Sequence, residues 1–312
     1  SEEARALVVA MLNEHQLLVF EKPIEHSVKR CYKCKRMIEP RVLTQWFIAV
    51  NQPGKSGKAL APDAAKAVAN GRVTFVTDKF RKIFDHWMNT IRDWNVSRQI
   101  VWGIQLPVWY CNSPEASRSQ NPSSNDKKVE PCLPIVTAGE IPTNCPICGG
   151  TELQRDSDVF DTWFSSCQWP VIVPKTTFES SDFERFYPTS VMETGHDIIF
   201  FWVARMIMLG LYTTGDVPFK TVYMHGLVRD KDRQKMSKSK GNVMDPLAVI
   251  DQYGADALRM ALVFGTAAGN DMPMDDEKIR GMRNFSNKVW NIARFVLTNL
   301  ENHELRIMNH GS

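Results

Sequence analysis

The sequence has little that would place it in a membrane or outside the cell. No apolar run approaches the roughly 18 residues that a membrane-spanning helix needs, and the first residues show no signal-peptide pattern. Seven cysteines in a chain without an export signal indicate metal binding or buried thiols rather than disulfides. We therefore expect a cytoplasmic protein that makes no contact with a membrane.

An excess of charge of either sign is also absent. Lysine and arginine total 38, aspartate and glutamate total 35, and the net charge of +3 is too small to predict nucleic-acid binding by itself. Any contact with RNA must therefore come from a local basic face. With 312 residues, 43% of them hydrophobic, the chain is long enough for two domains with a real core, and it has no internal repeats.

A common nucleotide-binding motif is missing as well. Residues 51–60 contain Gly54-Lys55-Ser56, which resembles the end of a P-loop. That motif needs a glycine five residues earlier, where this sequence has Ala49. The segment is therefore predicted to be a flexible loop that does not bind phosphate.

The most informative stretch that is present is a lysine-rich segment. Residues 234–242 hold three lysines, two serines and a glycine. Ammonium groups on flexible stems suit a polyphosphate, and hydroxyl and backbone N–H groups add donors. Taken alone, such a run is equally typical of a solvated surface loop. The flanks favour phosphate binding, because residues 221–228 predict a buried strand ending in His225-Gly226 and residues 246–263 predict a helix.

Apolar spacing predicts further helices along the chain. They cover residues 4–22 and 80–94, and another apolar helix opens within 193–202 and reaches Leu211. From Asp275 onward, an apolar stripe with a basic flank predicts an amphipathic helix.

Several motifs together resemble one enzyme family. The run Lys235-Met-Ser-Lys-Ser is the second signature of the class I aminoacyl-tRNA synthetases, and it stands after the predicted strand as it does in that family. Further similar motifs occupy residues 93–103, 158–170 and 193–202. Through nearly all of its length, the chain resembles the synthetases for branched-chain amino acids, and most closely those specific for valine.

This resemblance implies an α/β fold and a domain plan. The chain would contain the second half of a Rossmann-like catalytic domain with a zinc-ribbon-like insertion, followed by the start of an all-α domain. The implied parts are an exit segment of the editing insertion at 1–30, catalytic domain at 31–270 with the insertion at 108–152, and the start of the helical tRNA-contacting domain at 271–312.

The resemblance also implies roles for individual residues. The residues implied in catalysis on the phosphates are Lys235, Ser237 and Lys238. The residues implied in ATP binding are His225, Gly226, Leu227, Val228, Lys235 and Lys238. In the amino-acid site, Trp163 would form a flat wall, Asp197 would bind the α-ammonium group and Ile198 would narrow the pocket for valine.

Three residues near these motifs carry separate expectations. His196 would either approach ATP or pack on Trp202. Arg98 is expected to be a buried structural partner rather than a catalytic group. Cys167 is expected to be a small packing residue, because no histidine is placed to activate it.

The cysteine spacing suggests a structural zinc site. In Cys145-Pro-Ile-Cys148-Gly-Gly the glycines let backbone N–H groups turn toward the thiolates, as in one half of a zinc ribbon. The predicted ligands are Cys111, Cys132, Cys145 and Cys148; the alternative is a degraded ribbon without metal. Cys31 and Cys34 also have a chelating spacing, but they make only half of a tetrahedral site and are expected to be free thiols.

The reaction implied by the resemblance activates valine with ATP, with Mg²⁺ carried by the nucleotide, and transfers it to tRNA(Val). None of the seven histidines lies in a His-x-Gly-His tetrad, the first signature of the class. We therefore expect part of such an enzyme, at most feebly active by itself. We also expect a monomer. Two alternatives stay open: an isoleucine-specific enzyme, and a non-catalytic RNA-binding or assembly module.

Overall fold

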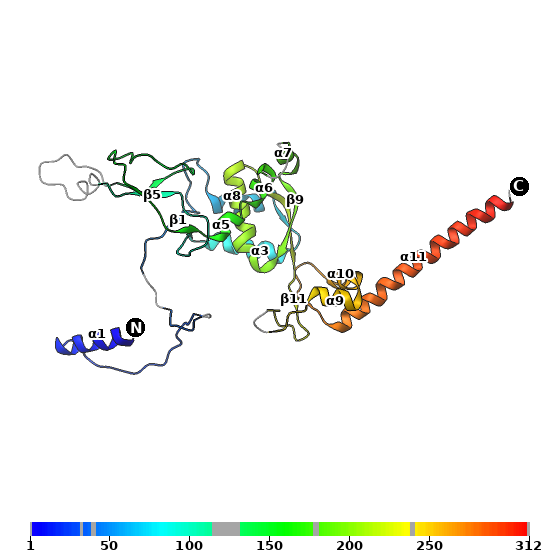
Figure 1. The fold of residues 1–312 in the computed structure, drawn as a ribbon, viewed down its shortest axis with the longest axis horizontal. Helices are drawn as coiled ribbons and strands as arrows, with labels where there is room; N and C mark the ends of the chain where they lie inside the picture. The colour runs from blue at the N-terminus through cyan, green and yellow to red at the C-terminus, as the bar shows by residue number, and fades with distance from the viewer. Residues whose placement is uncertain are drawn as a thin grey trace. The chain divides into compact units, whose positions relative to one another are not determined.

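The computed structural model describes residues 2–31, 34–38, 42–113, 132–176, 181–237 and 241–310, with only the helical backbone for residues 2 and 301–310 (Figure 1). The chain divides into two compact units, Ser1–Gln45 and Trp46–Ser312. The candidate catalytic residues all belong to the larger unit.

The described residues of the smaller unit include one helix. Helix α1 spans Glu2–Glu14, and the chain leaves it where Gln16 adopts a left-handed backbone with φ 54°. The helix is therefore shorter than the predicted 4–22. Further along, the backbone N–H of Cys31 donates to the Arg36 carbonyl at 2.8 Å, and Cys34 is exposed.

A parallel sheet organises the larger unit. Its strands are β2 (Thr74–Phe75), β9 (Thr189–Gly195) and β10 (Phe219–His225), in the order β2-β10-β9. On the central strand, Val222 and Met224 are each 1% exposed. A helical connection joins β9 to β10, which is the βαβ arrangement of a Rossmann-like fold.

Three helices pack with this sheet in one hydrophobic core. They are α2 (Leu60–Ala69), α3 (Asp78–Thr90) and α8 (Ala204–Thr214). A 3₁₀ turn, η1 (His196–Ile198), and a π-helical turn, η2 (Ile199–Val203), precede α8. The predicted helix 80–94 is wrong at its end, because Ile91 turns to extended backbone and Trp94 begins a strand.

The helical run through η1, η2 and α8 corrects one expectation from the sequence. Within the described residues, His196–Thr214 is the one helix long and apolar enough to cross a membrane, with a mean hydropathy of 1.4. However, 56% of it is buried in the fold, and every residue from Ala204 to Leu211 is buried. Its hydrophobicity is therefore that of a core helix.

Short antiparallel strands make a second region. The pairs are β1 (Phe47–Ile48) with β3 (Trp94–Asn95), and β4 (Ser97–Arg98) with β8 (Val159–Phe160). A three-stranded sheet contains β5 (Val108–Cys111), β6 (Ile135–Val136) and β7 (Leu153–Arg155), with β5 in the middle. The short helices that follow are α5 (Thr162–Ser166), α6 (Trp169–Thr176) and α7 (Asp182–Phe186).

The last region is helical. Its helices are α9 (Pro246–Tyr253), α10 (Ala255–Val263) and the long α11 (Asp276–His310), and its strands are β11 (Val228–Arg229) and β12 (Met272–Pro273). Asp245 caps α9 by accepting a hydrogen bond from the backbone of Leu247. The predicted helix 246–263 is therefore two helices, separated at Gly254 (φ 90°, ψ 153°). The predicted helix beyond Asp275 is present as α11.

Candidate active site

The candidate site lies at the carboxyl ends of β9 and β10. The two strands are parallel, and Gly195 and His225 are partners at their last register position. The segments that follow, His196-Asp197 and Gly226-Leu227, therefore leave the sheet at the same edge. In open α/β sheets, ligands bind at this edge.

Three of the predicted ATP-binding residues, at the end of β10 and just after it, line a cavity. His225, Gly226 and Val228 border a cavity of about 310 Å³. At Gly226 the chain touches the segment before β12, since an added Cβ would lie 1.7 Å from the carbonyl oxygen of Asn270. Only glycine fits there, because the neighbouring atom belongs to the backbone and not to a flexible side chain.

The backbone of Leu227 is bound by the side chain of Asp271. The Asp271 carboxylate accepts hydrogen bonds from the Leu227 backbone N–H at 2.8 Å, from His196 Nε2 at 3.0 Å and from Arg229 Nε. The Leu227 N–H, followed by the donors from His196 and Arg229, outweighs the effect of burial and holds the pKa of Asp271 well below its usual range. His196 also stacks on Phe80, with ring centroids 5.7 Å apart. These two contacts replace the packing on Trp202 that was one of the two expectations for His196.

The lysine-rich loop starts beside the same edge. Lys235 forms an isolated antiparallel bridge with Arg229, and its ammonium group lies 3.7 Å from the carboxylate of Asp197. Met236 packs on the hydrophobic cluster of α9, α10 and α11. The structure thus brings together a predicted phosphate-binding residue and a predicted amino-acid-binding residue. Lys238 lies outside the described residues.

The side chain of Asn242, at the end of the lysine-rich loop, is hydrogen-bonded to residues at the start of the loop and before it. Its amide oxygen accepts from the backbone N–H of Ser237 at 2.9 Å. Its amide nitrogen donates to Asp230 at 2.7 Å and to the Lys235 carbonyl at 3.3 Å. Positions Lys235 and Ser237 are therefore fixed by a side chain that the sequence analysis did not single out.

The other predicted amino-acid-binding residues lie on neighbouring elements. Ile198 ends η1 and is half-buried. Trp163 lies on α5 and stacks on Phe201 of η2, with ring centroids 5.6 Å apart. Among the described residues, no polar or ring contact joins Trp163 to Asp197, so its place as a wall of the pocket stays a prediction.

A buried ion network supports the start of α5. Asp161 caps that helix, and its carboxylate also accepts from the Trp94 indole at 3.0 Å, from Arg98 at 3.1 Å and from Arg205 at 3.3 Å. Arg98 is the structural partner that the sequence predicted, although its side chain is 40% exposed rather than buried. Arg205 is 8% exposed and lies 3.9 Å from the Trp94 ring centroid. Cys167 is 1% exposed, and burial raises its pKa to about 12, which fits a packing residue.

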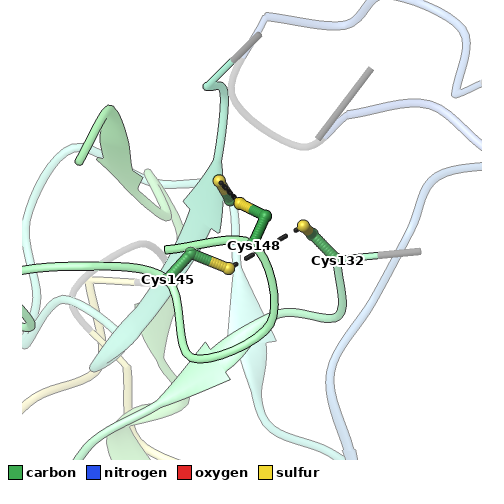
Figure 2. A group of neighbouring side chains, drawn as sticks. Cys132, Cys145 and Cys148 are labelled. Atoms are coloured by element: carbon green, nitrogen blue, oxygen red, sulfur yellow. Dashed lines mark hydrogen bonds between the residues drawn. The ribbon is translucent and has the colours of Figure 1, made fainter. Parts of the chain in front are cut away.

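The four predicted metal ligands converge beside β5. The sulfur atoms of Cys111, Cys132, Cys145 and Cys148 all lie within 4.8 Å of one another. Figure 2 shows the side chains of Cys132, Cys145 and Cys148 close together. The sulfur atoms of Cys111 and Cys148 are 3.5 Å apart, and those of Cys132 and Cys145 are 3.8 Å apart. A tetrahedral zinc with Zn–S bonds of about 2.3 Å requires sulfur separations of about 3.8 Å, so the donor set fits zinc.

Backbone N–H groups favour the thiolate form of one of these cysteines, Cys145, whereas burial raises the pKa of Cys132 to about 12. Burial opposes ionisation of Cys145, but N–H groups of Cys148 and Ile147 outweigh it and lower the pKa of Cys145 to about 7. The backbone of Gly150 also donates to Cys148 and favours its thiolate, but burial and the hydrogen bond with Cys111 outweigh this donor and raise the pKa of Cys148. Gly150 also packs on Ser113, where an added Cβ would lie 2.2 Å from the hydroxyl oxygen. Among the described residues, this is the one group of cysteine, histidine or acidic side chains close enough to hold a metal ion.

Comparison with known proteins places this geometry in a family. The family model described as "tRNA synthetases class I (I, L, M and V)" matches residues 13–275. The chain belongs to this family. A valine–tRNA ligase from Dehalococcoides mccartyi (strain CBDB1) is 46% identical over 300 residues, which are 96% of this chain and 31% of that protein. One from Clostridium acetobutylicum is 45% identical over 299 residues, again 96% of this chain and 31% of the relative.

This class I synthetase chain thus spans about 31% of the length of the curated relatives it matches, and the resemblance to valine-specific synthetases is confirmed. Among solved structures, it is similar to a LeuRS of Agrobacterium radiobacter K84 in a ternary complex with tRNA and LeuAMS. That match has a TM-score of 0.52 and 26% identity, and it covers 68% of this chain and 28% of that one. A methionyl-tRNA synthetase of Mycobacterium tuberculosis bound by methionyl-adenylate has a TM-score of 0.53 at 17% identity over 82% of this chain and 40% of that one, which shows a shared fold.

Proposed function

We propose that this synthetase chain carries part of the active site of a valine–tRNA ligase. The observation that supports this most directly is the 3.7 Å separation between Lys235 and Asp197 at the carboxyl ends of β9 and β10. A cationic loop for a triphosphate and an anionic group for an amino acid's ammonium meet there. Because these relatives are valine–tRNA ligases, the comparison supports valine rather than isoleucine as the substrate.

In the proposed ATP site, the backbone at His225, Gly226, Leu227 and Val228 receives the adenine beside the 310 Å³ cavity. Lys235, Ser237 and Lys238 face the phosphates. Each charge-assisted hydrogen bond contributes about 1.5–3 kcal/mol, so one clamp lysine accounts for tenfold or more in the activation rate.

In the proposed amino-acid site, Asp197 binds the α-ammonium group of valine, while Trp163 and Ile198 bound its side chain. The carboxylate of valine attacks the α-phosphate of ATP, and pyrophosphate leaves with Mg²⁺. The valyl-adenylate then transfers valine to the terminal ribose of tRNA(Val). Orientation and charge stabilisation carry such a transfer, so no side-chain nucleophile is needed. Cys167 is buried and therefore unsuited to act as a nucleophile.

The remaining parts of the proposal concern metal and partners. Cys111, Cys132, Cys145 and Cys148 would hold a structural zinc that fixes the insertion around β5. The basic side chains of α11 would approach tRNA, and they are Lys278, Arg280, Arg283, Lys288 and Arg294. The proposal further includes a monomer in the cytoplasm.

Calorimetric titration with ATP and with valine tests the proposal. We expect Lys235→Ala to weaken ATP binding about tenfold without weakening valine binding, and Asp197→Asn to abolish valine binding. Lys220→Ala is the matched control, since Lys220 is an exposed lysine on β10 away from the loop. Binding of both ligands that is unchanged in both site variants would contradict the proposal. Affinity for tRNA without any affinity for ATP or valine would favour a non-catalytic RNA-binding module.

A further inference from the structure

Asp271 connects three segments that the proposed reaction needs in fixed positions. Its Oδ1 atom accepts from His196, the neighbour of Asp197, and from the backbone of Leu227. Its Oδ2 atom accepts from Arg229, which precedes the lysine-rich loop. A single carboxylate therefore binds the end of β9, the end of β10 and the root of the loop.

Backbone contacts reinforce the same junction. The N–H of Met272 donates to the Leu227 carbonyl at 3.0 Å, and the N–H of Met274 donates to the Arg229 carbonyl at 2.9 Å. These bonds belong to the parallel pairing of β11 with β12. Asp271 stands immediately before β12, so its side chain and the backbone that follows it both bind Leu227 and Arg229.

The contacts close into a ring. Asp271 binds His196, His196 adjoins Asp197, and Asp197 pairs with Lys235. Lys235 bridges back to Arg229, which returns to Asp271. Every member of the ring therefore contacts either the lysine-rich loop or a residue that binds Asp271.

We propose that Asp271 is a positioning residue, which fixes Leu227 and the Arg229 root of the Lys235 loop in the arrangement that binds nucleotide. Its own oxygens are occupied by protein donors, so it acts through Leu227 and Lys235 and not by contact with substrate. The last step, nucleotide binding, rests on the proposed function. The anchoring of Leu227 and of the loop root does not.

Charge and burial explain why a carboxylate is suited to this position. The side chains of Asp271, Arg229 and His196 are 26%, 28% and 28% exposed, so water screens their contacts only in part. An ionised carboxylate accepts at both oxygens, whereas an amide at this position would turn a donor toward Arg229 or Leu227. The depressed pKa of Asp271 agrees with this preference for the ionised form.

The test compares Asp271→Asn with Asp216→Asn in the 312-residue chain. Asp216 is the matched control, because it also accepts from one arginine, Arg72 at 2.7 Å, and from one backbone N–H, that of Val217 at 2.7 Å. It lies before β10, at the opposite end of that strand from His225. Amide hydrogen exchange reports the anchoring, and titration with ATP reports its consequence.

We expect Asp271→Asn to speed exchange about tenfold at Leu227 and across residues 229–237, and to leave Val222 and Met224 inside β10 unchanged. The affinity for ATP should fall by a similar factor, with Asp271→Glu restoring part of it. Asp216→Asn should change neither readout.

Unchanged exchange at Leu227 in Asp271→Asn, or an equal change in both variants, would overturn the inference. Faster exchange with unchanged ATP affinity would overturn its last step. If the unaltered chain binds no ATP, the proposed function fails for this chain, and the exchange result alone then decides whether Asp271 anchors the loop.

Discussion

At the residue scale, the buried Asp161 carboxylate depends on two arginines of unequal burial. Arg205 is 8% exposed and packs against Trp94, whereas Arg98 is 40% exposed. Loss of a buried partner leaves a charge in a medium that solvates it poorly, and a half-exposed partner is replaced in part by water.

Replacement of Arg205 should therefore destabilise the fold far more than replacement of Arg98. We expect Arg205→Met to lower the free energy of unfolding by about 3 kcal/mol and Arg98→Met to lower it by about 1 kcal/mol or less. Urea unfolding at neutral pH measures both. Equal losses would show that the two arginines share Asp161 evenly.

The ionised state of Asp271 gives a pH dependence of known sign. Hydrogen bonds from Leu227, His196 and Arg229 depress its pKa in the folded protein, so its contribution is complete above the unfolded value of about 3.9 and declines as the pH falls below it. The stability difference between the unaltered protein and Asp271→Asn should thus shrink as the pH falls below about 4. Thermal unfolding between about pH 4 and about pH 2 checks this, and a difference that grows over that range would contradict it.

Sequence reasoning found the residues of the loop but not those that hold it. Lys235 and His225 stand in recognisable local patterns, whereas His196 and Asp271 are 75 residues apart and meet only through the fold. Arg205 is equally hidden, because it stands in the apolar helix α8 and its partner Asp161 is 44 residues away. Asn242 was within the lysine-rich run, but nothing in the run indicates that its amide binds Ser237 and Asp230.

At the scale of elements, the contact between the end of β10 and the segment before β12 tolerates no side chain at Gly226. We expect Gly226→Ala to force the two segments apart, which lowers the melting temperature and weakens ATP binding. Gly281→Ala is the control, since a Cβ there on α11 meets nothing within 4 Å. That change should stabilise the helix by about 0.5–1 kcal/mol. A Gly226→Ala protein with unaltered stability would refute the crowding seen here.

The four cysteines beside β5 give a prediction about metal content. We expect purified protein to contain one zinc per chain and Cys145→Ser to lose it, because three thiolates and a hydroxyl bind zinc less tightly. Cys34→Ser, at an exposed cysteine outside the cluster, should keep the metal. Elemental analysis of the two variants measures this. Zinc that is absent from the unaltered protein would favour the degraded ribbon.

Element boundaries were predicted least well where backbone geometry overrides apolar spacing. Residues 193–211 are apolar enough to suggest one helix, but the chain is a strand up to Gly195 and passes through η1 and η2 before α8. The helix beginning at Phe80 in the prediction begins at Asp78 and stops at Thr90, where Ile91 turns to extended backbone. By contrast, the strand before His225 and the Cys145–Cys148 pair were predictable, because strand burial and a two-residue ligand spacing are local properties.

At the scale of the whole molecule, the sequence contains the second class I signature, Lys235-Met-Ser-Lys-Ser, and no His-x-Gly-His tetrad. We therefore expect the isolated 312 residues to catalyse ATP–pyrophosphate exchange at a small fraction of the rate of an intact synthetase. Addition of a polypeptide that carries the tetrad should raise the rate. Exchange by the isolated chain at the rate of an intact enzyme would show that the tetrad is dispensable.

The pairing of Lys235 with Asp197 has one more consequence. If Asp197 binds the ammonium group of an amino acid as proposed, that group competes with Lys235 for the carboxylate, and a lysine released by this competition is available to a triphosphate. Binding of the amino acid would in this way make Lys235 available to ATP. Each of the two ligands would then raise the affinity for the other without any movement of the sheet beneath them.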